Sequence, residues 1–572
     1  MSASDPLNLK RNLLFLFERG QFTSVVEQAT KLSKKNPHDP HLWNLLGAAY
    51  AKLGDHESAK VAFQRVIGLS PLHIDANFNL AKVLTLINQK SDAIKVYKKV
   101  LKIDPKHFKS SYNLAILLRE EGDTSKALSA LYKTIKIKPD LAEAYNSLGS
   151  LLAELKQSVK SVNAFQRAIS LKPNYAEALY NLGEAFQDQG YFTEAIEAYN
   201  KSLTIKPDYA EAHNNKGIAL QEQGKLKEAM EAYNKSLAIK PDYADAHQNM
   251  GFALLAVKDF DLGFKKSEWR WKTGSRVNQF LKSSKPLWNG EKGQRVLVWN
   301  EQGIGDEIMF SSIIPEIYAT SLKILVKCDK RLIPLFERSF PTDVIYYSED
   351  AQVSEDEYDF HIPMGSLPLT FRKSLDSFKK SALGFLKCDT ARTEDIKGHL
   401  THKQNKKFVG ISWMTTSGLK NSSFRNIDLA DLARALDGPN TQLVCLQYGD
   451  VSNEIKAVKK DFGIDIIQFD DVDNKNDIDG LASLISACDQ IVSTTNITVH
   501  LAGALGEKVT ALLPFSPRWI WGDGSESFWY ESVTPLKQIC PHNWNDILDN
   551  LRSNISDRTL SNVSALGTDL TI

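Results

Sequence analysis

Small and proline positions in the first half of the chain recur with a period of 34 residues. A proline closes each period, and it ends a helix because it lacks an amide donor and clashes with the preceding turn. These prolines are Pro37, Pro71, Pro105, Pro139, Pro173, Pro207 and Pro241. A small residue recurs in the same phase, at Gly47, Ala81, Ala115, Gly149, Gly183, Gly217 and Gly251. We therefore expect paired antiparallel helices over residues 6–271, with seven repeats to about residue 243 and a degenerate eighth that ends near Trp271.

Three further sets of residues recur with the same 34-residue period. Each such set of equivalent positions is called a column below. A second small residue lies at Ala59, Ala93, Ala127, Ala195 and Ala229, with Ser161 as an exception. Aromatic residues follow at Phe63, Tyr97, Phe165, Tyr199 and Tyr233, and we expect them to fill the space between repeats. A turn residue lies at Gly20, Gly54, Gly122, Gly190 and Gly224. The whole pattern is the tetratricopeptide signature, which predicts a right-handed superhelix with a long groove for a polypeptide or another extended partner.

An asparagine column lies two residues before the small column. Its members are Asn79, Asn113, Asn181, Asn215 and Asn249. An amide offers both a donor and an acceptor, so the column can bind the backbone of an extended acceptor peptide whatever its sequence. The alternative is that asparagine is common at this position and bonds only locally. The column resembles that of the protein O-GlcNAc transferase family, in which the repeats hold the acceptor polypeptide.

The 34-residue period stops after Trp271, and residues 272–294 are a polar stretch that we interpret as a linker. Apolar, strand-like runs then alternate with helical patterns. The runs are 295–300, 323–328, 343–347, 407–413, 441–448, 464–469, 490–495 and 508–514. This alternation predicts parallel sheets in βαβ units, with a pause over the polar residues 380–406. We predict two Rossmann-like lobes, 295–380 and 407–545, that face each other across a cleft lined by the carboxyl ends of their strands.

The first strand end in this region carries Gly303, Gly305 and Asp306, between a predicted strand and a helix. Glycines let the backbone approach a ligand closely. Asp306 would begin the helix and point into the cleft. The alternative role for this residue is an N-cap, for which aspartate is well suited.

A later strand feeds a helix that is expected to begin near Asn496. The free amides and the dipole of that helix start make an anion site suited to a diphosphate. Hydroxyls of Thr495 and Thr498 would add donors. His500 lies one turn into the helix, where it would either reach a phosphate or be buried and structurally satisfied.

The loop that follows the strand at 407–413 contains Lys420 and Arg425. Basic side chains at this place would neutralise phosphate charge, and the alternative is an ordinary solvated loop. Near the next strand end, Gln447 and Tyr448 would contact a nucleotide base or ribose.

An acidic stretch before Gly480, FDDVDNKNDIDG, looks like a metal loop. It fails the EF-hand pattern, which would require an acidic or amide ligand where Lys475 stands. We interpret it as a solvated loop that leads to a capped helix, and we expect no metal site.

The motifs in the second half resemble those of bacterial proteins that join tetratricopeptide repeats to a glycosyltransferase-like domain. The segments that carry this resemblance are EQGIGDEIMFSSIIPEI, RLIPLFERSFP, LQYGD, VHLAGALG, WIWG and WYESV. The domain resembles the ADP-heptose:lipopolysaccharide heptosyltransferase family, which implies the two-lobed GT-B fold and makes Asp306 the catalytic base. One departure concerns Thr495 and Asn496, which stand where that family usually has an Asp-Thr pair. The departure weighs against heptose as the sugar and leaves the diphosphate site in place.

Composition sets the broad class of the protein. A net charge of +1 gives no global electrostatic reason to bind nucleic acid. Residues up to Lys272 carry 38 Lys and Arg against 30 Asp and Glu, a charge of +8, and the remainder carries −7. The five cysteines are scattered and odd in number, which favours buried thiols in a reducing compartment. No transmembrane segment is expected, since no apolar run reaches about 18 residues, so the predicted location is cytoplasmic.

These features support two functions. The first is a metal-independent glycosyltransferase that needs no cofactor and moves a sugar from a nucleotide-diphosphate sugar, bound mainly to the second lobe, to a protein held by the repeats. The second is a non-catalytic tetratricopeptide scaffold with a degenerate transferase-like domain. The polar residues 552–572 are expected to be a disordered tail.

Overall fold

The computed structural model describes residues 6–274, 279–381, 384–401, 406–415, 425–522 and 524–553. The chain divides into two compact units, Met1–Gln189 with Thr204–Lys206, and Gly190–Leu203 with Pro207–Ile572. This division falls inside the sixth helix pair. The last two helix pairs therefore belong to the same unit as the sheets, although the repeat pattern places them with the other repeats.

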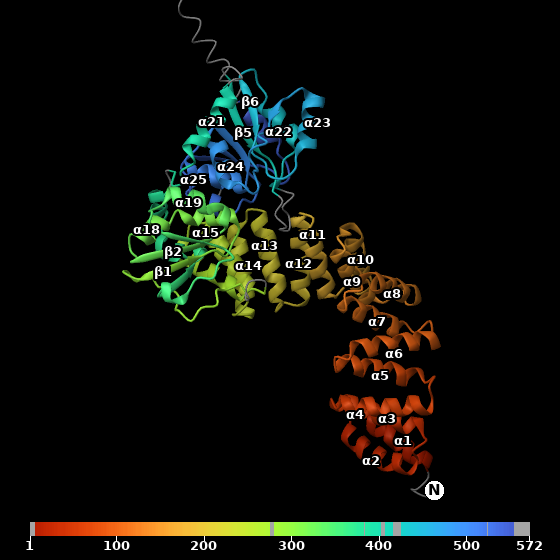
Figure 1. Cartoon of the computed structure of the whole chain (residues 1–572). Coiled ribbons are helices and arrows are strands. Elements are labelled where there is room, and N and C mark those ends of the chain that lie inside the picture. Colours follow the sequence, from red (N-terminus) through yellow and green to blue (C-terminus); the bar gives the residue numbers. More distant parts are fainter. Residues whose placement is uncertain are drawn as a thin grey trace, which may run out of the picture. The chain divides into compact units, whose positions relative to one another are not determined.

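Helices occur in consecutive pairs over residues 6–272, as the period predicts (Figure 1). Their bounds are α1 (Pro6–Glu18), α2 (Phe22–Lys35), α3 (Pro40–Leu53), α4 (His56–Leu69), α5 (Ile74–Leu86), α6 (Lys90–Ile103), α7 (Phe108–Glu120), α8 (Thr124–Ile137), α9 (Ala142–Glu154), α10 (Ser158–Leu171), α11 (Ala176–Gln187), α12 (Phe192–Ile205), α13 (Ala210–Glu222), α14 (Leu226–Ile239), α15 (Ala244–Ala256), α16 (Phe260–Ser267) and the 3-10 helix η1 (Glu268–Lys272).

The small column is explained by close contact within each pair. A Cβ on Gly149 would lie 2.6 Å from the ring of Phe165, and one on Gly217 would lie 2.5 Å from the ring of Tyr233. The aromatic residue thus packs on the small residue of its own helix pair, whereas the sequence analysis expected it to fill the space between repeats. Adding a side chain here forces the two helices of a pair apart.

We expect Gly149→Val to destabilise the first unit by about 1–3 kcal/mol, because overpacking displaces Phe165 and the helix that carries it. The matched control is Gly68→Ala, since nothing lies within 4 Å of a Cβ at that helical position. This control should keep or slightly raise stability. Urea unfolding followed by circular dichroism measures both, and equal effects of the two variants would contradict the packing explanation.

A left-handed turn joins the two helices of each pair. Its residue lies at positive φ at Gly20, Gly54, Asn88, Gly122, Lys156, Gly190, Gly224 and Lys258. Glycine is the usual residue because it has no Cβ to clash in this conformation. The structure therefore extends the turn column to three periods in which the sequence has no glycine.

The first sheet has four parallel strands in the order β3-β2-β1-β4. They are β1 (Arg295–Trp299), β2 (Lys323–Cys328), β3 (Ile345–Ser348) and β4 (Phe360–Pro363). Its helices are α17 (Ile304–Ser311), α18 (Ile314–Tyr318), α19 (Ile333–Ser339) and α20 (Pro368–Phe371). The strand predicted at 343–347 begins two residues later, at Ile345, and β4 was not among the predicted strands.

The second sheet has six parallel strands in the order β10-β9-β8-β5-β6-β7. They are β5 (Lys407–Ser412), β6 (Thr441–Cys445), β7 (Ile466–Ile467), β8 (Gln490–Thr494), β9 (Val509–Leu513) and β10 (Val533–Lys537). Numbered along the chain, this is the doubly wound order 3-2-1-4-5-6, in which ligands bind where the order reverses, between β5 and β8. The helices are α21 (Thr390–Thr401), α22 (Leu429–Leu436), α23 (Ser452–Phe462), α24 (Ile478–Ser486) and α25 (Ile497–Leu505).

Three further segments differ from the sequence interpretation. Strand β10 was not among the predicted strands. Helix α21 lies inside the stretch 380–406, where its polar composition gave no apolar stripe to predict a helix from. Part of the segment interpreted as a linker follows strand β4: the Trp288 amide donates to the His361 carbonyl at 2.9 Å, and the Trp288 side chain is buried. The predicted tail lies outside the described residues from 554 onward.

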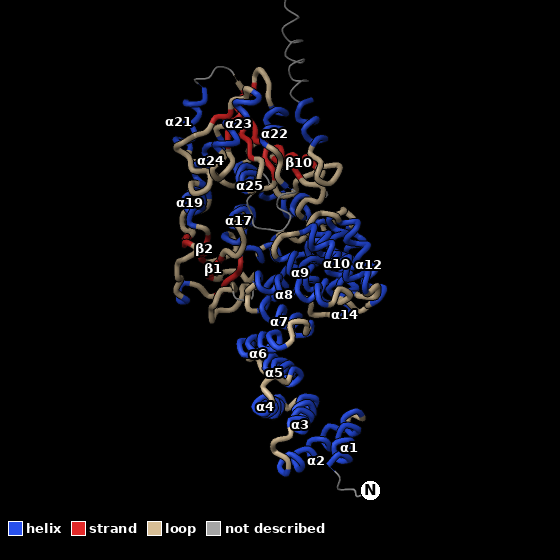
Figure 2. Tube along the Cα trace, turned by 90° about the vertical axis from the view of Figure 1, so that its right-hand side faces the viewer, coloured by secondary structure: helices blue, strands red, loops and turns tan. Residues whose placement is uncertain are grey.

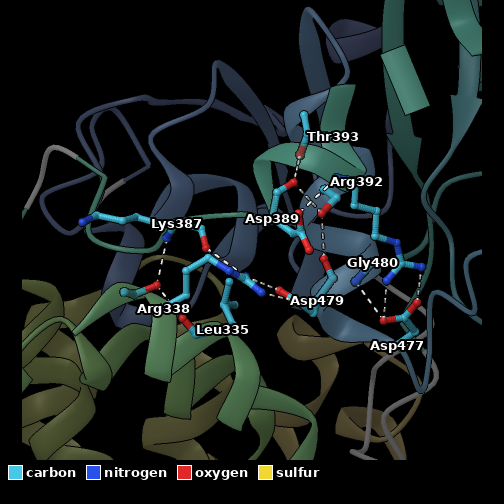
Figure 3. Close-up of polar contacts among 11 residues, drawn as sticks. Leu335, Arg338, Lys387, Asp389, Arg392, Thr393, Asp477, Asp479 and Gly480 are labelled. Atoms are coloured by element: carbon cyan, nitrogen blue, oxygen red, sulfur yellow. Dashed lines mark hydrogen bonds and ion pairs between the residues drawn. The ribbon is translucent and has the colours of Figure 1, made fainter. Parts of the chain in front are cut away.

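An ion pair at the start of α24 joins the region of the first sheet to that of the second (Figure 3). Arg338 of α19 makes a bidentate pair with Asp479, at 2.6 and 2.8 Å. Arg392 of α21 pairs with Asp477, which also caps α24 by accepting from the Gly480 amide at 2.8 Å. The acidic loop is thus a capped helix start, as the sequence analysis proposed.

The last helix pair packs into the same apolar core as the two sheets. Phe260 and Phe264 of α16 belong to the same apolar core as Val296 of the first sheet and Ile491 of the second. Beside this core, the buried guanidinium of Arg270 donates to both carboxylate oxygens of Glu301, at 2.8 and 2.6 Å. The eighth repeat therefore forms a rigid joint next to the strand end that carries Gly303.

Candidate functional site

A cavity of about 340 Å³ lies at the carboxyl ends of the strands of both sheets. Helices α17 and α25, which follow β1 and β8, pack against each other there (Figure 2). The lining residues are Gly303, Ile304, Gly305, Asp306, Arg331, Thr415, Arg425, Tyr448, Asn474, Lys475, Ile478, Thr495, Asn496, Ile497, His500 and Arg518. Most of the residues that the sequence analysis selected from three separate strand ends are therefore gathered in one cavity.

Asp306 lies in the first turn of α17, whose N-cap is Gly303. It is therefore not the N-cap of its own helix. Its carboxylate lines the cavity, and Oδ1 lies 3.9 Å from Nη1 of Arg518. Gly305 is needed for the close approach of the lobes, because a Cβ there would lie 3.2 Å from the ring of His500.

Asn496 caps α25 and ties two strand ends together. Its Oδ1 accepts from the Thr498 amide at 2.9 Å. Its Nδ2 donates to Ser412 Oγ at 2.7 Å and to the Met414 carbonyl at 3.1 Å. This side chain therefore fixes the region between β5 and β8, and the neighbouring residues Thr495 and Ile497 line the cavity.

The two candidates deeper in α25 have different environments. Thr498 is fully buried, and its hydroxyl lies outside the cavity lining with no hydrogen-bond partner within the described part of the chain. His500 lines the cavity, and its Nδ1 lies 3.1 Å from the Tyr530 hydroxyl. Burial, and then the nearby Arg518 cation, lower the pKa of His500 to about 3. The imidazole is therefore neutral at physiological pH.

The candidate residues after β5 and β6 differ in whether they line the cavity. Arg425 and Tyr448 line the cavity, as does Thr495 after β8. Gln447 does not: its buried Oε1 accepts from the amides of Trp413 and Met414, at 2.9 and 3.0 Å. It holds the loop after β5 in place. Lys420 lies outside the described residues.

Sequence analysis missed several lining residues. Arg331 follows β2, and Asn474 and Lys475 belong to the acidic loop that was interpreted only as a helix cap. Arg518 lies in the loop after β9, where no glycine or strand-end motif marks it. The position of a residue in a βαβ unit predicts that it reaches the carboxyl edge, but it does not predict which long side chain turns inward.

The cavity is electropositive. Among the described lining residues four are Lys or Arg, and Asp306 is acidic. Arg331 is neutralised by a bidentate pair with Asp329. Such a site favours an anionic ligand, since fixed cations compensate its charge where water is displaced.

The seventh repeat reaches the edge of this cavity. Ser516 Oγ donates to the Gln221 carbonyl at 3.1 Å, at the end of α13. The adjacent Glu222 is within electrostatic reach of Arg425. Burial raises the pKa of Glu222 to about 7, although Arg425 opposes this shift. The repeats and the cavity are therefore in contact within the second unit.

A buried carboxyl next to Asp306 has a structural role. Glu307 Oε2 accepts from the Asp329 amide at 2.9 Å, and Oε1 accepts from Asn300 Nδ2 at 3.3 Å. Burial raises the pKa of Glu307 to about 7. This side chain ties the ends of β1 and β2 together behind the cavity.

Members of the asparagine column bond between successive repeats. Asn181 Nδ2 donates to Asn146 Oδ1 at 2.9 Å, and Asn249 Nδ2 donates to Asn214 Oδ1 at 3.0 Å. Both acceptors precede the donors by 35 residues. The amide column therefore links neighbouring first helices, which supports the local alternative without using all the hydrogen-bonding capacity of each amide.

The other members of the column are also half-buried. Asn113 Nδ2 donates to the Tyr97 hydroxyl at 3.1 Å, within the joint between two repeats. Asn215 Oδ1 accepts from Asn214 Nδ2 at 3.2 Å. Asn79 occupies the equivalent place on α5. Peptide binding by this column stays a prediction.

Across the described residues, no helix is both long and apolar enough to cross a bilayer. In the same part of the chain no group of three or more His, Cys, Asp or Glu side chains is arranged to hold a metal ion.

Comparisons with known proteins concern mainly the repeats. Protein FlbA of Caulobacter vibrioides is 31% identical over 268 residues, which span 43% of this chain and 44% of FlbA. YrrB, a TPR protein with an unusual peptide-binding site, has a TM-score of 0.29 and 23% identity, and the match covers 32% of this chain and 95% of YrrB. MamA has a TM-score of 0.28 and 32% identity, over 29% of this chain and 96% of MamA.

Tetratricopeptide-repeat models match the chain in five stretches. These stretches are residues 16–74, 52–114, 87–142, 142–175 and 174–242. They coincide with the helix pairs and with the glycine–aromatic contacts described above. The region from residue 16 to 242 consists of tetratricopeptide repeats.

Proposed function

We propose that the protein is a glycosyltransferase that moves a sugar from a nucleotide-diphosphate sugar to a polypeptide held by its repeats. The observation that carries this proposal is the single cavity at the carboxyl edges of two parallel sheets. It is bordered by a carboxylate, Asp306, from one lobe, and by cations and a helix start from the other. The two lobes would then form a GT-B arrangement, with the donor mainly on the second lobe.

The chemistry assigned to these groups is a displacement at the anomeric carbon. Asp306 takes the proton of the acceptor hydroxyl as the hydroxyl oxygen bonds to that carbon, a contribution of about 10²–10⁴-fold. The bond from the anomeric carbon to the phosphate oxygen breaks, and the nucleoside diphosphate leaves with its electron pair. Arg425 and the amides at the start of α25 stabilise the developing charge.

Donor binding tests the proposal directly. A bound nucleotide-sugar at about 100 times its Kd stabilises the folded state by about 2.7 kcal/mol, which raises the melting temperature of a unit of this size by roughly 3–4 °C. We expect such a rise for one member of a nucleotide-sugar panel, and a loss of most of it in Arg425→Ala. Arg434→Ala on α22, outside the cavity, is the matched control and should keep the shift. A panel without any shift would contradict a donor site.

The acceptor side is tested through the asparagine column. We expect the double variant Asn181→Ala/Asn249→Ala to weaken binding to an array of random-sequence peptides several-fold. The reason is that two side-chain amides that would bind the peptide backbone are lost. The replaced bonds also join repeats, so a loss of about 1 kcal/mol of stability per site is expected without unfolding. Asn234→Ala on the exposed side of α14 is the control. Peptide affinity equal to that of the control would leave the column as a purely structural link.

A second candidate function is a scaffold that binds proteins without catalysis. It is favoured by the repeats, which are a protein-binding framework, and by Asn496, whose side chain is used in bonds that fix the strand ends. In that case the cavity would bind a nucleotide-sugar weakly or not at all, and no sugar transfer would accompany peptide binding.

A further inference from the structure

Arg518 is carried by a segment that contacts both the first lobe and the eighth repeat. The segment comprises residues 515–530, of which 523 lies outside the description. The indole Nε1 of Trp529 donates to the Met309 carbonyl of the first lobe at 3.0 Å. The rings of Trp519 and Phe264, which belongs to the eighth repeat, contact each other edge to face, with 5.6 Å between their centroids. The backbone of this segment is therefore held by both a lobe and a repeat.

The backbone at Arg518 is fixed, and its side chain extends into the cavity. The Trp521 amide donates to the Arg518 carbonyl at 3.0 Å. The side chain is 42% exposed, and its Nη1 lies 3.9 Å from Asp306 Oδ1, where the Asp306 side chain is 24% exposed. That separation exceeds the 2.7–3.2 Å range of an N–H···O hydrogen bond, so the pair is loose.

We propose that Arg518 is shared between Asp306 and the diphosphate of the donor. Without donor the guanidinium faces the Asp306 carboxylate. When donor binds, the guanidinium turns to the phosphate oxygens, and Asp306 is left to take the proton of the acceptor hydroxyl. Arg518 is then a catalytic residue that makes the base available only after the donor is bound. This inference rests on the proposed transferase function.

The relative strengths of the two contacts support this exchange. A partly exposed ion pair contributes roughly twofold to fivefold to an equilibrium constant. A phosphate can accept two parallel charge-assisted bonds from one guanidinium, whereas the contact with Asp306, at 3.9 Å, is too long for a hydrogen bond. A diphosphate in the cavity therefore competes successfully for Arg518. Tyr530, which is within electrostatic reach of Asp306, is buried, and burial raises its pKa, so it stays neutral during this exchange.

A double-mutant cycle on the full chain tests the sharing, with inorganic pyrophosphate as the probe and titration calorimetry as the measurement. We expect Arg518→Gln to weaken pyrophosphate affinity by at least about tenfold. Asp306→Asn should strengthen it by roughly twofold to fivefold, because it releases Arg518. In the Arg518→Gln background, Asp306→Asn should have no effect on the affinity, because nothing remains to be released.

Each other outcome overturns the proposal. A gain from Asp306→Asn that persists in the Arg518→Gln background would mean simple repulsion between Asp306 and the anion. Unchanged affinity in Arg518→Gln would remove Arg518 from the anion site. Lys258→Gln, which breaks the pair between the eighth repeat and Glu526 on the same segment, controls for loosening of the segment and should bind pyrophosphate normally.

The cycle also separates this inference from the proposed function. Coupling between Arg518 and Asp306 without sugar transfer would support the shared arginine and contradict the transferase function. Sugar transfer without such coupling would support the transferase function and contradict the shared arginine. An absence of binding by pyrophosphate and by nucleoside diphosphates would defeat both.

Discussion

Asp306→Asn should lower sugar transfer by about 10²–10⁴-fold without weakening nucleotide-sugar binding. The amide keeps the size of the side chain and cannot accept the proton of the acceptor hydroxyl. The loss should therefore appear in kcat, since the group acts in the transition state and contributes little to ground-state binding. Release of nucleoside diphosphate in the presence of a peptide acceptor measures the rate, and the thermal shift measures donor binding.

The control for this prediction is Asp350→Asn, which removes an exposed carboxylate after β3 in the same lobe. Its transfer rate should equal that of the unmodified protein. Near-normal turnover in Asp306→Asn would show that another group takes the proton. A loss of donor affinity in that variant would instead point to a binding role.

Arg270→Met should destabilise the second unit by about 3–5 kcal/mol, because it leaves the Glu301 carboxylate buried without its cation. The two side chains are 4% and 1% exposed, so water cannot compensate the charge. For a unit of this size the melting temperature should fall by roughly 4–6 °C. Scanning calorimetry measures the fall, with the transition of the first unit as an internal reference.

The matched variant is Arg270→Met/Glu301→Gln, which removes the stranded charge together with the cation. Part of the lost stability should return, because a neutral amide is less costly to bury than a carboxylate. A fall of less than about 2 °C in the single variant would contradict the role of this pair as the joint between the eighth repeat and the first lobe.

The repeat region could be predicted almost completely because its determinants are local and repeated. The proline spacing, the small column and the turn glycines each act within one helix pair. The same packing therefore recurs in every repeat. The packing partner of the aromatic column could not be read from spacing alone. The contact of Phe165 with Gly149 depends on how closely two helices approach.

The parallel sheets were also predictable, since buried strands that alternate with helices fix the connection type. Gly303, Asp306 and Asn496 could be selected because they directly follow strands, and the carboxyl ends of parallel strands share an edge. The side chains of Gln447 and Asn496 were assigned to a ligand in the sequence analysis. In the structure Gln447 accepts from a backbone amide and Asn496 donates to a hydroxyl, and both contacts fix loops.

What the sequence determined by itself is therefore the repeat period, most of the helices and strands, and the strand ends at which chemistry can occur. The tertiary structure decided which side chains share one cavity and what charges surround them. Arg518 lies 212 residues after Asp306 and reaches it through a segment held by Trp519 and Trp529. The physical reason is that hydrophobic periodicity acts over a few residues, whereas electrostatic contacts and shared burial depend on long-range packing that no local pattern encodes.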